Sequence, residues 1–392
     1  MRKAGVFFLL LCLTVSALTL TAGAKLPSAA AGNGGSAAAG ETTGRAGGTP
    51  GDEGERDYLA EIADAVPEEY RAAFGGHDAS ELVGAEYLFS VLLSGLRNES
   101  GAALRLFAAL LGIVLLGRVV TEVGGDGEKG QGRVAEVLLS SVCATAFFAV
   151  VAGSVSRVGA YLGDLRTFLN ASTPALTALL VAGGSTAAGG TAAASFSLGL
   201  FLLENLLAGV LYPLTGVCFA FGLLDTVSPD LRLGGVSKHL KWLYMTLIGV
   251  ASTVSTAALS FQTTLAASAD SVAMRSARYA VGNIIPLVGN SIGAALGTLG
   301  SSLSLIKNTA GVSCVAAVLL MTLPELLSLF LARLAVSAAG TAAEALGFTA
   351  GEKLLASFLK IYDMLLATVA AAGVTWILYF SVVLRVAYPT VA

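Results

Sequence analysis

Few residues in this chain have the types and spacing that catalysis requires. Its two histidines, His77 and His239, lie outside the apolar runs, and no His-Glu-x-x-His pair occurs. A serine–histidine or zinc centre at membrane depth would need a histidine there. The stretch from Gly125 to Gly130 has the letters Gly-x-Gly-x-x-Gly, but apolar segments flank it, so it is predicted to be a polar turn. No catalytic, cofactor-binding or metal-binding residue is predicted.

Two acidic residues inside apolar runs are the clearest candidates for a function that depends on charge. Glu204 precedes Asn205, and Glu325 follows Pro324. A carboxylate in hydrocarbon is costly, so such residues commonly serve proton or ion movement. They can equally bond to a neighbouring helix or lie near an interface. The sequence leaves both interpretations open.

The composition is that of a protein dissolved in lipid. Apolar residues make up 55% of the 392 and charged residues 12%, with a mean hydropathy of +0.78. A soluble domain carries about 25% charged residues. The net charge of −3 provides no basic face for nucleic acid. We therefore expect an all-α polytopic integral membrane protein whose solvent is the lipid bilayer.

The N-terminal quarter is predicted to be translocated. Arg2 and Lys3 precede an apolar stretch, and Ala22-Gly23-Ala24 resembles a cleavage site, which predicts a signal peptide over 1–24. An uncleaved first helix is the alternative. Residues 25–57 are predicted to be a flexible linker rich in Gly, Ala and Ser. Residues 58–100 show helical periodicity and are predicted to be an extracytoplasmic amphipathic segment.

The remaining 101–388 are predicted to be a multi-spanning membrane domain. Two further stretches, Thr167 to Leu203 and Tyr279 to Ile306, are uncharged but rich in small residues, so each could be a span or a re-entrant segment. The expected total is about six to eight transmembrane helices. The clearest candidates are 101–120, 134–153, 197–224, 242–262, 311–335 and 361–384.

The signal peptide also predicts an orientation. With six spans, the loops at 121–133, 225–241 and 336–360 face the cytoplasm and the C-terminus lies outside. An extra span at Thr167 to Leu203 would reverse everything after it. Three basic residues in or at the end of the second loop agree with the positive-inside rule: Arg232, Lys238 and Lys241.

A polar block and a glycine stripe adjoin one another after residue 269. Gly289, Gly293 and Gly297 recur at intervals of four, so in a helix they form one bare face that another backbone can approach closely. This face could pack within one protomer, pack between copies or subunits, or line a channel. The candidate functional residues of the preceding block are Asp270, Arg275, Arg278, Asn283 and Pro286.

The same block carries a family resemblance. Ser276-Ala-Arg-Tyr-Ala-Val-Gly-Asn-Ile-Ile-Pro-Leu-Val-Gly289 and Ser302-Leu-Ser-Leu-Ile-Lys-Asn-Thr-Ala-Gly311 closely resemble the stage III sporulation protein AE family. Ser237-Lys-His-Leu-Lys-Trp242 also looks like that family. The likeness covers roughly residues 58–385.

The resemblance implies a membrane subunit of endospore-forming bacteria. Such a protein would be made in the mother cell and lie in the membrane that surrounds the forespore. With other stage III sporulation proteins it would help build a channel resembling specialised secretion systems. The resemblance implies no enzymatic activity. The alternative is a stand-alone secondary transporter with broken helices.

Overall fold

The computed structural model describes residues 64, 66–68, 85–124, 131–182, 186–206, 210, 212–227, 234–284 and 289–386. The predicted signal peptide and linker, and most of the predicted amphipathic segment, lie outside these ranges. Side chains are described for most residues but not for 277–309.

Nearly all of the described residues are helical, and none of them lies in a strand. Long runs of Ala, Leu and other good helix formers explain this, because they lose little freedom in a helix and are separated by few prolines. The helices are α5 (Ala85–Gly124), α6 (Gln131–Ala182), α7 (Thr186–Leu206), α8 (Tyr212–Val227), α9 (Gly234–Ile284), α10 (Gly289–Ala345) and α11 (Thr349–Val386).

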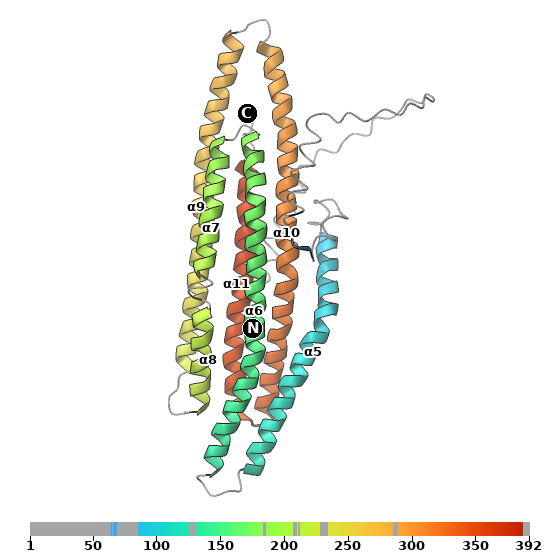
Figure 1. Ribbon diagram of the computed structural model, residues 1–392, viewed down its shortest axis with the longest axis vertical. Helices are drawn as coiled ribbons and strands as arrows, with labels where there is room; N and C mark the ends of the chain where they lie inside the picture. Colours follow the sequence, from blue (N-terminus) through green and yellow to red (C-terminus); the bar gives the residue numbers. More distant parts are fainter. Residues whose placement is uncertain are drawn as a thin grey trace, which may run out of the picture.

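These helices run up and down in one elongated bundle (Figure 1). Neighbours in sequence are antiparallel, except that α7 and α8 follow one another in the same direction and together make one pass. The α10–α11 pair is joined by a tight turn in which Gly347 has a φ of 70°, a conformation that favours glycine.

Five of the described helices are long and apolar enough to cross a membrane. Each contains one of the predicted spans, which agrees with the expected all-α membrane fold. Their apolar parts are Glu86–Glu122, Ser141–Ala178, Gly235–Ala266, Ala310–Ala345 and Thr349–Val382.

The predicted span at 197–224 is described as parts of two helices. Helix α7 ends at Leu206 and α8 begins at Tyr212, and of the residues between them only Val210 is described, in a π-helical turn. Pro213 lies at the second position of α8, where a missing backbone N–H is tolerated, and this favours a helix start.

The two ambiguous stretches each contain a helix boundary rather than one added spanning helix. In the first, α6 ends at Ala182 and α7 begins at Thr186. In the second, α9 ends at Ile284 and α10 begins at Gly289. The first predicted span also begins earlier than expected, because α5 runs without a break from Ala85.

Helices α9 and α10 are much longer than a bilayer is thick. They have 51 and 57 residues, which at 1.5 Å per residue gives about 76 and 85 Å, against about 30 Å of hydrocarbon. Their connected ends extend past the ends of α6, α7 and α11 (Figure 1). The glycine stripe lies in the first turns of α10 and therefore in this extension.

The core of the bundle is the α10–α11 pair. In the most apolar window of α10, 67% of residues are buried, and in that of α11 56%, against 17% in α5 and in α9. Helix α10 packs on α5, α6 and α11, and α11 packs on α6, α8 and α9. At Gly373 a Cβ would lie 2.5 Å from Thr322 Cγ2, so glycine lets the two central helices approach closely.

The peripheral helices present large apolar side chains outward. On α5 these include Phe89, Leu104 and Leu116, and on α9 Trp242 and Phe261, each 66–67% exposed. An exposed apolar face of this length is what lipid contact requires.

Candidate functional site

Two networks of charged side chains join helices in the part of the bundle that the structure describes. The first, which we call the clamp, consists of Lys241 on α9, Arg333 on α10 and Asp363 on α11. Lys241 Nζ bonds to Asp363 Oδ2, and Arg333 Nε donates to Asp363 Oδ1 at 2.5 Å. Each carboxylate oxygen therefore has its own cation.

The clamp lies close to the borders of three predicted spans. Lys241 directly precedes the predicted span 242–262, Asp363 is the third residue of the predicted span 361–384, and Arg333 lies two residues before the end of the predicted span 311–335. The side chains are 16–29% exposed. Charges at this position can be solvated at one end while they tie the helices together.

The second network, which we call the triple junction, joins α5, α6 and α10. Arg157 Nη1 on α6 donates to Ser328 Oγ on α10 at 2.6 Å, and Ser328 Oγ donates to Glu99 Oε2 on α5 at 3.0 Å. The Arg157 and Glu99 charges are 4.0 Å apart. Ser328 thus forms hydrogen bonds to both a cation and a carboxylate, which come from different helices.

Glu325 completes the triple junction but is left without a bond. It lies one turn before Ser328 on α10, and the charges that act on it are those of Arg157 and Glu99. Its Oε1 is buried and has no hydrogen-bond partner. The network therefore contains two carboxylates and one guanidinium, unlike the clamp.

Hydroxyl pairs continue these contacts along the core. They bridge α6 to α11, α6 to α10, α9 to α11 and α7 to α9, so each internal helix contributes a polar contact. The pairs are Ser154–Tyr362 at 2.9 Å, Tyr161–Thr322 at 2.9 Å, Tyr244–Thr368 at 2.5 Å and Ser195–Gln262 at 2.6 Å.

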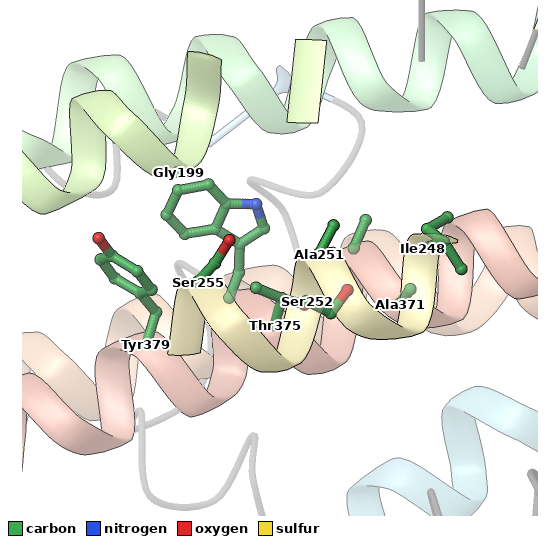
Figure 2. A pocket seen from close by; sticks show the side chains of 10 residues that line it. Gly199, Ile248, Ala251, Ser252, Ser255, Ala371, Thr375 and Tyr379 are labelled. Carbon is green, nitrogen blue, oxygen red and sulfur yellow. The ribbon is translucent and has the colours of Figure 1, made fainter. Parts of the chain in front are cut away.

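A small cavity lies between α7, α9 and α11 (Figure 2). Gly199, Ser252, Ser255, Thr375 and Tyr379 are among its lining residues, and its volume is about 30 Å³. A water molecule needs roughly 10–15 Å³ of such space, so the cavity can hold water between hydroxyl groups.

The structure places the predicted site residues in different parts of the bundle. Glu325 lies in the triple junction. Glu204 lies near the end of α7, and its side chain is outside the described residues. Asp270, Arg275, Arg278 and Asn283 lie in the last turns of α9, and Gly289, Gly293 and Gly297 in the first turns of α10; their surroundings are outside the described residues, as is Pro286 itself.

Sequence reasoning identified neither the two charged residues that act on Glu325 nor the three residues of the clamp. Arg157 and Glu99 follow and precede predicted spans, and Asp363 and Lys241 stand at the borders of two others. Charges at such borders are common, so their position alone carries little signal. Only the packing of distant helices brings them together.

The comparison with protein families decides the identity of this bundle. The family model of stage III sporulation protein AE matches residues 79–387. The chain belongs to this family. Membership implies a role in sporulation, and it agrees with the resemblance of the block around Gly289.

A curated relative supports the assignment. The chain is 28% identical over 156 residues to the stage III sporulation protein AE of Bacillus subtilis (strain 168), a match that covers 39% of this chain and 38% of that protein. The aligned region thus spans well under half of the curated relative. No solved structure matches the chain.

Proposed function

We propose that this protein is a non-enzymatic membrane subunit of the channel complex that connects the mother cell with the forespore. It would lie in the mother-cell membrane around the forespore and act with other stage III sporulation proteins. The family match over residues 79–387 is the observation that carries the proposal. The five helices of membrane-spanning length supply the required setting.

The use of charge in the bundle is consistent with a structural subunit. In the clamp, both cations bond to Asp363 from neighbouring helices. Such contacts fix helices against one another in an apolar medium. They suit a scaffold that must keep its shape within a larger assembly.

A secondary transporter is the second candidate, and the π-helical turn at Val210, between α7 and α8, favours it. Transporters use discontinuous helices to frame a substrate site. Here α7 and α8 pack mainly on α6, α9 and α11, whereas the charges that act on Glu325 are those of Arg157 of α6 and Glu99 of α5. The cavity beside α7 has a volume of only about 30 Å³. The α7–α8 segment and Glu325 therefore do not form one site.

Deletion of the gene separates the two candidates. The channel-complex proposal predicts normal growth in rich medium, arrest of development around or after engulfment, and loss of heat-resistant spores. An intact copy of the gene at another locus should restore development and heat-resistant spores. A growth defect with a normal spore yield would contradict the proposal and favour the transporter.

The glycine stripe provides a test of assembly. If its bare face packs against another subunit, Gly293→Leu should abolish co-purification with other stage III sporulation proteins while the protein still inserts and accumulates. Gly293→Ala is the matched control and should be mild. Loss of the protein itself would indicate a contact within one protomer, since overpacking costs about 1–3 kcal/mol. Normal co-purification with normal spores would show that the stripe makes no subunit contact.

A further inference from the structure

Glu325 is isolated in sequence. Between Lys307 and Arg333 it is the only Asp, Glu, Lys, Arg or His, and most of this run belongs to the apolar part of α10. Pro324 precedes it within the helix. Proline has no backbone N–H and frees a carbonyl one turn earlier, so the helix is locally less rigid at this point.

The groups that face Glu325 come from two neighbouring helices. Arg157 of α6 attracts its charged form, and Glu99 of α5 repels it. Arg157 is already engaged, because it donates to Ser328 and lies 4.0 Å from Glu99. Lys241 of α9 and Asp363 of α11 bond to each other in the clamp, and Arg157 is the one cation whose charge acts on Glu325 among the described residues. No second cation therefore stands opposite Glu325 among the described residues.

The charge balance of the triple junction then requires a proton. With both carboxylates ionised, its net charge would be −1 at a position where one carboxylate oxygen is buried without a partner. An uncompensated charge in such surroundings neutralises by binding a proton. We propose that Glu325 is a proton-binding site: in the packed bundle its carboxyl group is neutral, and release of its proton loosens the contact of α5 with α6 and α10.

The loosening follows from competition for one guanidinium. When the O–H bond of the Glu325 carboxyl breaks, the proton passes to water and the electron pair stays on the carboxylate. The new anion attracts Arg157, whose bond to Ser328 and pairing with Glu99 then weaken. Arg157 and Glu99 side chains are 47% and 34% exposed, so the bundle itself does not close the junction off from its surroundings.

Infrared spectroscopy of the full-length protein in nanodiscs tests the site directly. A protonated carboxyl group has its own C=O stretching band. We expect this band in the wild-type protein at neutral pH, its loss at higher pH, and its absence in Glu325→Gln. Glu344→Gln removes an exposed acid from the same helix and should leave the band unchanged. No band in the wild type, or a band that persists in Glu325→Gln, would overturn the proposal.

Substitution of Glu99 and of Arg157 should shift the pH at which the band disappears in opposite directions. A folding defect would not produce opposite shifts. Glu99→Gln removes the repelling carboxylate, so the band should disappear at a lower pH than in the wild type. Arg157→Gln removes the attracting cation, so it should disappear at a higher pH. Circular dichroism verifies that each variant stays helical. Equal or same-direction shifts would mean that the band belongs to another carboxyl group and would contradict the proposal.

Discussion

The clamp and the triple junction use the same side chains in opposite ways. In the clamp one carboxylate meets two cations from two helices. In the triple junction one guanidinium meets two carboxylates, and one carboxylate oxygen stays without a partner. The first arrangement satisfies its acid completely and resists change. The second leaves an acid whose charge depends on a proton, so it can respond to its surroundings.

The positions of the two networks reinforce this difference. The clamp joins α9, α10 and α11, including the buried central pair, close to the borders of three predicted spans. The triple junction attaches α5, a peripheral helix, to the same α10. A change in the clamp therefore acts on the core of the bundle, and a change in the junction acts on the docking of one outer helix.

The largest effect is expected from Asp363→Asn. The substitution leaves two cations facing a neutral amide, and breaking such a buried pair costs about 3–5 kcal/mol. The thermal midpoint of the protein in detergent should fall strongly, with less protein in the membrane. Lys241→Gln in addition should recover part of the loss, because it removes one of the stranded cations. An Asn variant with the wild-type midpoint would show that the clamp does not hold the bundle.

Packing between the central helices is expected to rank second. Gly373→Ala places a Cβ 2.5 Å from Thr322 Cγ2 and disturbs the Tyr161–Thr322 bond. The expected cost is about 1–3 kcal/mol, measured as the loss in thermal midpoint. Gly340→Ala is the matched control, since its Cβ would lie an ordinary 3.7 Å from Leu355 Cβ. Equal thermal midpoints for the two variants would mean that the contact between α10 and α11 accommodates the added methyl group at Gly373.

A smaller effect is expected from Arg157→Gln. The pair with Glu99 is partly exposed, so its contribution is about 1 kcal/mol or less. The loss of stability should be concentrated in α5, the helix that carries Glu99. Hydrogen exchange of the α5 backbone should rise while that of α11 stays unchanged. Uniform acceleration across the bundle would indicate that the junction supports the core as the clamp does.

The smallest effect on stability is expected from Glu325→Gln. If the carboxyl group is neutral in the packed bundle, an amide of similar shape replaces it with little change in midpoint at neutral pH. At higher pH the wild type should lose stability as the proton leaves, and the Gln variant should not. Parallel pH profiles for the two proteins would contradict the difference between the networks.

The sequence was sufficient for the fold class but not for the extent of its helices. The apolar runs located α5, α9, α10 and α11, because burial in lipid requires such runs. They did not show that α6 continues past residue 153 through Asp164 and Arg166 to Ala182. Helix formation depends on local propensity and packing, which continue beyond the apolar run, whereas hydropathy only reports the part that lipid can cover.

The same limit applies to the candidate site. Glu325 could be singled out because a lone acid in an apolar run is costly wherever it packs. Its partners Arg157 and Glu99 are 168 and 226 positions away in the chain, and no local pattern links them. Asp363 was overlooked because a charge at the edge of a span has an ordinary explanation. Pairing between distant helices is a property of packing, and only the structure provides it.

The different roles of the two networks can be tested in one measurement of spores and protein together. Heat-resistant spores are counted and membrane-bound protein is quantified for strains that carry Asp363→Asn or Glu325→Gln. We predict that Asp363→Asn lowers both in proportion, because the bundle fails to hold together. We predict that Glu325→Gln keeps the amount of protein and lowers the spores formed per unit of it, because the junction is locked in its neutral state. Wild-type spore yield per unit of protein in Glu325→Gln, or equal loss of protein in both strains, would contradict this account.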